Sequence, residues 1–117
     1  MTKEQLATMA KGAMEQAYSP YSGYKVGAAL LCKDGSVYTG CNVENASFSA
    51  TNCAERTAFF KAVSEGKKEF AAIAVCGGKD GVIEGLFPPC GVCRQVMREF
   101  CEDNFEIYLL KSDGIET

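Results

Sequence analysis

Three cysteines in two short segments have the spacing of metal ligands. Cys53 lies within residues 52–56, and Cys90 and Cys93 lie within residues 89–94. Because Cys90 and Cys93 are three residues apart, one helical turn can direct both sulfurs at the same ion, and Cys53 can supply a third sulfur from a neighbouring helix. Three thiolates suit Zn2+, and an open fourth position is typical of a catalytic zinc site rather than a structural one. The two segments therefore predict a catalytic zinc site.

A carboxylate stands close to the first of these cysteines. Glu55 follows Cys53 by two residues, and at the start of a helix this offset turns its side chain away from the ligand position. The carboxylate would then lie near the ion without binding it. There it can accept a proton from water that the metal activates and return the proton to a substrate. Zinc and a proton shuttle together indicate hydrolysis.

Composition narrows the classes of partner. The chain has 117 residues, of which 47% are hydrophobic and 23% are charged, as expected for one globular domain over residues 1–117. The net charge is -3 and the Lys and Arg residues are scattered, so the sequence offers no basic face for a nucleic acid polymer. No apolar run approaches the roughly 20 residues that cross a membrane. Seven cysteines without an export signal indicate a reducing compartment, and we expect a cytoplasmic protein.

The pattern of apolar and turn residues predicts how the reactive side chains are positioned. We expect helices over residues 3–18, 52–66 and 90–103, strands over residues 24–32, 36–41, 70–76 and 105–110, and a long loop over residues 77–89. The first two strands form a hairpin, and a helix joins the last two, which makes their pairing parallel. This order predicts an α/β fold, a three-layer α/β/α sandwich with a mixed sheet. Both cysteine segments then begin helices beside one sheet, where the helix dipole favours thiolates.

Residues at the predicted helix ends support this assignment. Thr2 and Gln5 have the spacing of a capping box at the start of the first helix. Asn52 can cap the second helix, and Gly66 occupies the place of a C-terminal glycine.

The motifs resemble a known enzyme family. Cys-x-Glu followed by Pro-Cys-x-x-Cys is similar to the signature of zinc-dependent nucleoside deaminases, with Cys53 where relatives place His or Cys. The similarity to small homotetrameric cytidine deaminases extends from the first predicted helix to about Leu110. The matching stretches are Tyr21-Ser22 with Tyr24, Val26–Leu30, Gly40–Ala46, Cys53–Ala58 and Pro89–Gln95. This resemblance implies a cytidine deaminase-like fold.

The resemblance implies metal and catalytic roles for five residues. Cys53, Cys90 and Cys93 would hold one Zn2+ per subunit, and Glu55 would be the acid/base catalyst. Arg56 matches an arginine that hydrogen-bonds the thiolates in members with three cysteines. Three thiolates make a Zn2+ site negative, which reduces the acidity of its water, and a neighbouring arginine would restore part of that acidity.

Substrate contacts are implied for five further residues. Asn42 and Glu44 match positions that hydrogen-bond the sugar hydroxyls, and Tyr24 matches an aromatic position that lines the pocket. Val43 and Ala54 would also contact the substrate. A carboxylate that faces the ribose would repel a phosphate, which favours nucleosides over nucleotides.

The implied activity is hydrolytic deamination of cytidine and deoxycytidine, which gives uridine and deoxyuridine plus ammonia in pyrimidine salvage. The partners would be a small nucleoside and water, with no nucleic acid polymer and no membrane, and the enzyme would be a cytoplasmic homotetramer. The chain ends at Thr117, shortly after the fourth predicted strand. Family members typically continue into another strand and a C-terminal segment that helps to close a neighbouring pocket, so we expect that part to be missing.

Other interpretations of the same residues compete with this one. Glu55 could form a capping box with Asn52, and Cys90 with Cys93 could be a redox pair of the thioredoxin type. A structural zinc site would need a fourth cysteine, for which the candidates are Cys41, Cys76 and Cys101. These three and Cys32 are otherwise expected to be small core residues. The competing functions are deamination of another aminopyrimidine nucleoside such as blasticidin S, editing of a polynucleotide, and a zinc-stabilised interaction module without activity.

Overall fold

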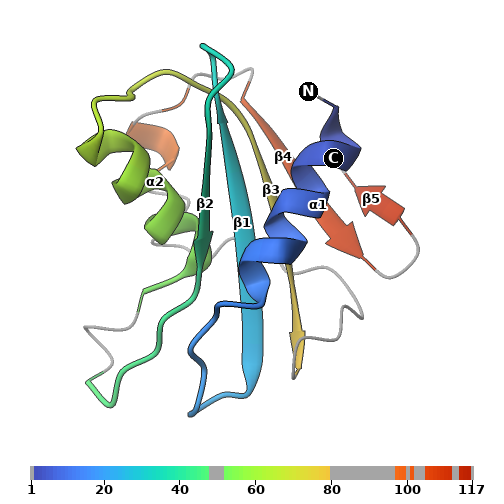
Figure 1. Cartoon of the computed structure of the whole chain (residues 1–117), viewed down its shortest axis with the longest axis vertical. Helices are drawn as coiled ribbons and strands as arrows, with labels where there is room; N and C mark the ends of the chain where they lie inside the picture. The colour runs from blue at the N-terminus through green and yellow to red at the C-terminus, as the bar shows by residue number, and fades with distance from the viewer. Residues whose placement is uncertain are drawn as a thin grey trace.

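Helices and strands follow one another along the chain in a mixed α/β order (Figure 1). The computed structural model describes residues 2–47, 52–79, 97–99, 101, 105–111 and 114–116. The helices are α1 (Lys3–Met14) and α2 (Ala54–Ser64), and residues 97–99 are also helical. The strands are β1 (Tyr24–Cys32), β2 (Val37–Cys41), β3 (Phe70–Lys79), β4 (Glu106–Lys111) and β5 (Gly114–Glu116). Within these described ranges, no helix has the length and apolar character needed to cross a membrane.

The five described strands form one mixed sheet with the order β2-β1-β3-β4-β5. β1 pairs antiparallel with both β2 and β3, and β4 pairs antiparallel with β5. β3 and β4 are parallel, with Ala72 opposite Glu106 and Val75 opposite Leu109. The predicted hairpin, the mixed sheet and the parallel pairing of the last two predicted strands are therefore confirmed.

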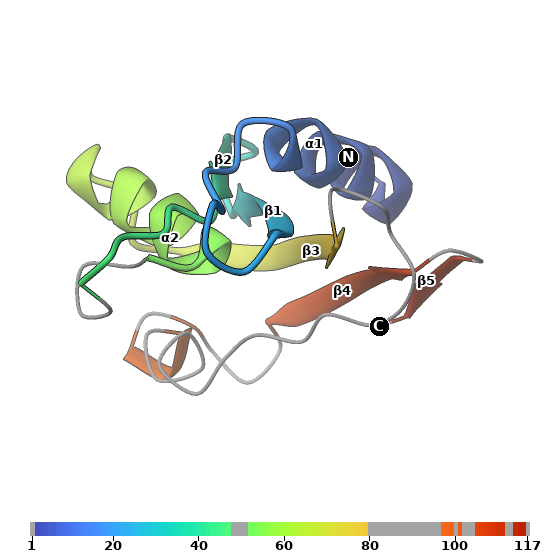
Figure 2. The ribbon, with the colours of Figure 1, turned by 90° about the horizontal axis from the view of Figure 1, so that it is seen from below.

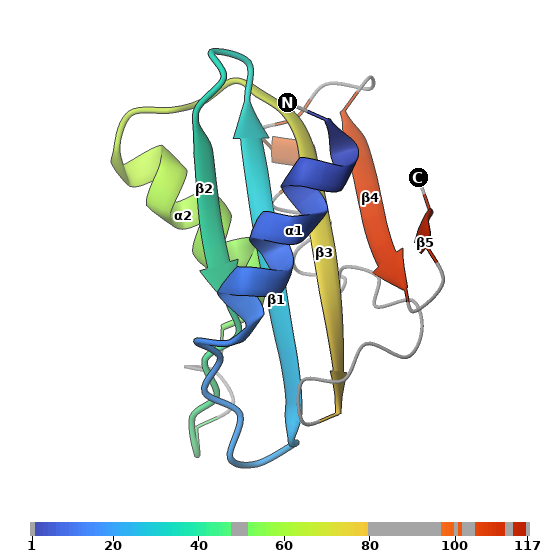
Figure 3. The same ribbon diagram turned by 45° about the vertical axis from the view of Figure 1, so that its right-hand side comes forward.

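Helices cover the two faces of this sheet (Figures 2 and 3). Successive side chains of a strand point to opposite faces. Accordingly, Ala28 and Leu30 of β1 join the buried cluster that contains Phe59 of α2. Ala29, which lies between them, joins the cluster that contains Leu6 of α1. Met97 belongs to the α2 cluster, so the helical residues 97–99 lie on the same face as α2. The predicted three-layer α/β/α sandwich is confirmed.

Helix α1 starts as predicted and ends early. The side chains and backbones of Thr2 and Gln5 form both bonds of the capping box. The helix ends at Met14, one turn before the predicted end at residue 18. The prediction of the last turn is wrong because Tyr18 pairs its backbone with the segment after β2, donating its N–H to Asn42 O at 3.0 Å. A helix through Tyr18 would lose this pairing.

Other elements also differ from the prediction, in their bounds or in their presence. β3 continues beyond Cys76 to Lys79, because Gly77 and Gly78 still pair with β1. β5 was not predicted and follows β4 as a short antiparallel strand, so the chain does not stop after four strands. Helix α2 begins at Ala54 rather than at residue 52, whereas its C-terminal glycine, Gly66, has the expected positive φ of 89°. Most of the predicted helix 90–103 and of the predicted loop 77–89 lies outside the described residues.

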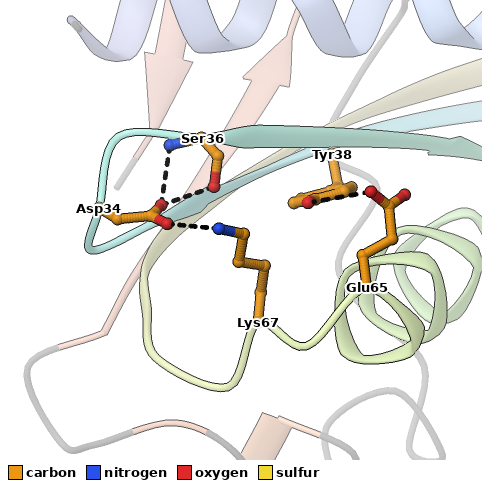
Figure 4. A network of polar contacts seen from close by, with 5 residues as sticks. All are labelled: Asp34, Ser36, Tyr38, Glu65 and Lys67. Atoms are coloured by element: carbon orange, nitrogen blue, oxygen red, sulfur yellow. Dashed lines mark hydrogen bonds and ion pairs between the residues drawn. The ribbon is translucent and has the colours of Figure 1, made fainter.

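A surface network ties the end of α2 to the β1–β2 hairpin (Figure 4). The carboxylate of Asp34 accepts bonds from the N–H and hydroxyl of Ser36 at 3.0 and 2.6 Å, and from Lys67 Nζ at 2.7 Å. The bond from Lys67, followed by those from Ser36, holds the pKa of Asp34 well below its usual range. Nearby, Tyr38 Oη donates to Glu65 at 3.4 Å. Because solvent screens exposed pairs, this network mainly orients the loop after α2.

Close packing of α2 on β2 depends on Gly40. A Cβ atom at this position would lie 2.5 Å from Ala54 O and 2.6 Å from Ala58 N. We expect Gly40→Ala to lower the free energy of unfolding by about 1–3 kcal/mol, because helix backbone rather than a mobile side chain must move. Gly12→Ala is the matched control, since Gly12 lies in α1 with no atom near its virtual Cβ.

The control variant should gain about 0.5–1 kcal/mol from its higher helix propensity. Urea unfolding followed by circular dichroism measures both variants. Equal free energies of unfolding for Gly40→Ala and the parent would contradict the close approach of α2 to β2.

Candidate active site

Backbone hydrogen bonds bring three remote segments together at one end of the molecule. Val43 N–H donates to Asn52 O at 2.9 Å, and Asn52 N–H donates to Val43 O at 2.8 Å. Tyr18 N–H donates to Asn42 O at 3.0 Å, and Glu44 N–H donates to Tyr18 O at 2.8 Å. The segment that carries the predicted sugar contacts is therefore fixed directly beside the segment that leads into the predicted metal ligand.

Helix α2 begins at this junction with Cys53 as its N-cap residue. Cys53 has extended backbone angles (φ -77°, ψ 156°), and its side chain makes no capping bond. The prediction of Asn52 as the cap is wrong, because Cys53 holds that position and the backbone of Asn52 pairs with Val43. Glu55 is then the second helical residue, whereas a capping box needs it at the third position. The capping-box interpretation of Glu55 is therefore excluded.

The sulfur of Cys53 has a cationic neighbour. Arg56 Nη2 lies 3.3 Å from Cys53 Sγ, and both residues are half-buried. A guanidinium and a helix N-terminus each stabilise negative charge on sulfur. This environment suits a cysteine that binds Zn2+ as the thiolate. Arg56 makes the contact with a ligand sulfur that the resemblance implied for it.

The other two predicted ligands, Cys90 and Cys93, lie outside the described residues. Among the residues that the structure describes, no three His, Cys, Asp or Glu side chains form a metal site. Residues 97–99 come four residues after Cys93, and Met97 belongs to the cluster against which Cys53 packs. The chain that follows the Cys-x-x-Cys segment thus returns to the face of the sheet that holds the start of α2.

Glu55 is buried in the first turn of α2, with 4% of its surface exposed. Burial of a carboxylate costs free energy that hydrogen bonds or nearby charges must offset. Buried ionisable groups in such places are enriched at functional sites. The position beside Cys53, without a capping role, agrees with a proton carrier next to a metal.

Asn42 follows β2 and is held against β1 by its side chain. Its Oδ1 accepts from Val26 N–H at 2.9 Å, and its Nδ2 donates to Tyr24 O at 2.8 Å. These bonds use one lone pair and one N–H of an amide that offers two of each. The buried side chain is therefore oriented firmly, and its bonds to the described part of the chain leave one lone pair and one N–H for a ligand.

Glu44 is held by the turn that precedes β1. Its Oε1 accepts from the N–H groups of Tyr21 and Ser22, both at 3.0 Å, and its Oε2 accepts from the Ser22 hydroxyl. The bond from the Ser22 hydroxyl, with the backbone bonds, lowers the pKa of Glu44, so the group is ionised at neutral pH. Tyr24, the predicted aromatic contact, is 43% exposed at the start of β1.

The two remaining predicted contacts differ in what they can offer a ligand. Val43 uses its backbone N–H and carbonyl in pairing with Asn52, and its side chain is 43% exposed. Ala54 is fully buried, so its side chain faces the core rather than a ligand. As the first residue of α2, its N–H has no acceptor within the helix. Contact through Val43 would involve the side chain, and contact through Ala54 the backbone.

Sequence reasoning assigned no role to two residues that organise the site. Thr57 Oγ1 lies 3.1 Å from both Cys41 O and Cys53 O and accepts from Asn52, so it joins the end of β2 to the start of α2. Its position four residues after Cys53 was a usable signal, because threonine often bonds the carbonyl one turn back. Ser22 had no such signal, since its partner Glu44 is 22 residues away.

Comparisons with known proteins show which family the chain belongs to. Residues 1–109 match the family described as "Cytidine and deoxycytidylate deaminase zinc-binding region". The chain belongs to this deaminase family. A cytidine deaminase from Sporosarcina psychrophila is 54% identical over 119 residues, which cover 100% of this chain and 85% of that protein. A cytidine deaminase from Halalkalibacterium halodurans is 53% identical over 114 residues, which cover 97% of this chain and 83% of that protein.

A solved structure of similar fold supports the same assignment. The crystal structure of cytidine deaminase from Burkholderia pseudomallei has a TM-score of 0.90 and 50% identity, and the match covers 99% of this chain and 91% of that one. Membership of the deaminase family confirms the predicted fold and Zn2+ as the cofactor. A zinc-binding family also argues against a redox pair at Cys90 and Cys93. The roles of individual residues stay predictions.

The thiols of the four other described cysteines have raised pKa values. Cys76 is fully buried on the α1 face of the sheet, so it cannot be a fourth ligand beside Cys53 on the α2 face. Burial raises the pKa of Cys76 to about 11 and that of Cys101 to about 12. Burial also raises the pKa of Cys32 and of Cys41.

Thiol labelling of this deaminase should therefore depend on zinc. At pH 8 a thiol with a pKa of 11 is a thiolate in only about one molecule in a thousand, so it reacts slowly. We expect removal of zinc by a chelator to add three fast-reacting thiols, those of Cys53, Cys90 and Cys93. Absorbance after addition of an aromatic disulfide counts them. If zinc removal left the number of fast-reacting thiols unchanged, that result would contradict a zinc site of three cysteines.

Proposed function

We propose that the protein hydrolyses cytidine and deoxycytidine to uridine and deoxyuridine plus ammonia, a reaction of pyrimidine salvage. One observation carries the proposal: the start of α2, with Cys53 and the buried Glu55, is paired through Asn52 and Val43 to the segment of Asn42 and Glu44. A metal ligand, a proton carrier and polar groups for a sugar therefore come from adjoining segments. The named relatives at 54% and 53% identity are cytidine deaminases.

The residues that would hold the metal are Cys53, Cys90 and Cys93, with one Zn2+ per subunit. When bound, Zn2+ supplies the Lewis acidity that makes water a nucleophile at neutral pH. Arg56 donates a hydrogen bond to Cys53 Sγ, which withdraws negative charge from the sulfur. The result is a less electron-rich ligand set and a stronger Lewis acid.

Glu55 moves the protons of the reaction. It accepts a proton from the attacking water and donates it to N3 of the cytosine ring, which makes C4 electrophilic. The water oxygen forms a bond to C4, and Glu55 then moves the remaining proton of the new C4 hydroxyl to the exocyclic nitrogen. The C4–N bond breaks and ammonia leaves, so cytidine and water become uridine and ammonia.

The sugar is bound by groups that the fold orients in advance. Asn42 retains a donor and an acceptor beyond its bonds to β1, and Glu44 is an oriented carboxylate. Tyr24 covers the nucleoside with its exposed ring. An ionised Glu44 beside the sugar disfavours a phosphate there, so nucleosides are preferred over nucleotides.

We also infer a single catalytic domain that assembles as a cytoplasmic homotetramer. The five described cysteines are free thiols, as in proteins of a reducing compartment. Tyr18, Tyr21, Tyr24 and Val43 expose 43% to 64% of their surface around the candidate site, and such apolar groups are suited to contact between subunits. Light scattering of the zinc-loaded protein measures the assembly, and a stable monomer at micromolar concentration would contradict it.

A substrate panel tests the proposed function. The zinc-loaded protein is assayed under identical conditions with cytidine, deoxycytidine, deoxycytidylate and blasticidin S, and ammonia is measured in each case. We expect kcat/KM to be highest for cytidine and deoxycytidine and at least about tenfold lower for deoxycytidylate, because its phosphate approaches Glu44. A preference for deoxycytidylate or blasticidin S would overturn the proposal.

A further inference from the structure

Ser22 connects two of the residues proposed to bind the nucleoside. Its hydroxyl donates to Glu44 Oε2 and accepts from Tyr24 N–H at 3.0 Å. Its own N–H donates to Glu44 Oε1 at 3.0 Å. The hydroxyl has only one proton, and the carboxylate can only accept, so the bond to Tyr24 must run from the backbone N–H to the serine oxygen. The Ser22 hydroxyl thus acts as donor to Glu44 and as acceptor for Tyr24.

These bonds determine how Glu44 can meet a ligand. A carboxylate has about four lone-pair sites. Among the described residues, Tyr21 N–H, Ser22 N–H and the Ser22 hydroxyl occupy three of these sites, which leaves one for an outside donor. Bonds on both oxygens also stop the carboxylate from rotating. Without the Ser22 hydroxyl, Oε2 would lose its described protein partner, and the carboxylate could turn about the bonds on Oε1.

We propose that Ser22 is a positioning residue that holds the carboxylate of Glu44 in the geometry that recognises the ring hydroxyls of the nucleoside sugar. This inference rests on the proposed function, in which Glu44 and Tyr24 face the substrate. Ser22 acts through Glu44 and touches no reacting atom. Its effect therefore falls on substrate binding through the sugar and leaves the chemistry at the base unchanged.

The alternative is that Ser22 only stabilises the turn before β1. Both interpretations predict some loss on Ser22→Ala, so the test compares cytidine with 2′,3′-dideoxycytidine, which lacks both ring hydroxyls. For the zinc-loaded full chain, we expect Ser22→Ala to raise KM for cytidine about tenfold, as loss of one charge-assisted orienting bond can do. We expect kcat for cytidine to stay within about threefold of the parent, and kinetics with dideoxycytidine to be unchanged.

Two further variants complete the test. Ser22→Thr keeps the hydroxyl and should restore the parent KM for cytidine. Ser22→Cys keeps the shape with a weaker donor and should give an intermediate KM. Thermal unfolding of each variant shows whether it is folded. Ser22 lies on the exposed surface, so we expect all three variants to fold.

The outcomes separate this inference from the proposed function. Equal losses on cytidine and dideoxycytidine, or no loss on either, would overturn the role of Ser22 while the deaminase activity stands. A parent protein that releases no ammonia from cytidine would overturn the proposed function, and the role of Ser22 with it. A selective rise in KM for cytidine, reversed in Ser22→Thr, is the expected result.

Discussion

Replacing Glu55 by Gln should lower kcat for cytidine by about 10²–10⁴-fold while zinc stays bound. The amide keeps the size of the side chain and cannot carry the proton between water, N3 and the leaving amine, and a positioned acid/base catalyst contributes about this factor. Steady-state kinetics, with zinc measured on the same samples, give the comparison. Because Gln has nearly the same size and shape as Glu, we expect the variant to keep the parent fold, which thermal unfolding of the same samples checks.

Glu65→Gln provides the matched control for this experiment. Glu65 is the exposed C-cap residue at the other end of α2, so the same chemical change there should leave kcat within about twofold. A Glu55→Gln variant that keeps zinc and more than about a tenth of the parent kcat would contradict the role of Glu55 as the proton carrier.

Replacing Cys53 by Ala should remove both zinc and activity. Only two of the three predicted ligands would remain, and a site with two ligands does not hold Zn2+ against dialysis. Metal analysis after gel filtration should give well under about 0.1 zinc per chain, and ammonia release should fall below detection. Arg56→Gln removes a hydrogen-bond partner of the ligand rather than the ligand, and should weaken zinc binding by about 10–100-fold.

Cys76→Ala is the appropriate control, because Cys76 is buried on the opposite face of the sheet from Cys53. It should keep one zinc per chain and its activity. If Cys53→Ala retained equimolar zinc, the metal would be bound elsewhere, and the interpretation of the two cysteine segments would be wrong.

The sequence alone was sufficient for features that depend on local pattern. The run Tyr24–Cys32 predicted β1 with its observed bounds, and Thr2 with Gln5 predicted the capping box of α1. Cys53 and Glu55 were predicted near the start of a helix, where the structure has them. These features require only periodicity and the preferences of helix ends, which neighbouring residues determine.

Long-range contacts account for what the sequence did not predict. Tyr18 leaves the helix because it pairs with Asn42, and Asn52 lies outside α2 because its backbone pairs with Val43. The link from Ser22 to Glu44 joins residues whose spacing carries no periodic signal. β5 has three residues, too few to show an alternating pattern. The roles of the sugar-binding residues came from resemblance, because polar loop residues have no distinctive spacing.

The central claim is that this chain is a deaminase whose activity depends on one zinc ion. The direct measurement strips the purified protein of metal, adds zinc back in steps, and follows uridine and ammonia formed from cytidine at each step. The account predicts equal amounts of the two products, in proportion to bound zinc, with a plateau at one zinc per chain. A fully zinc-loaded protein that forms neither product, or a stripped protein that retains full activity, would contradict it.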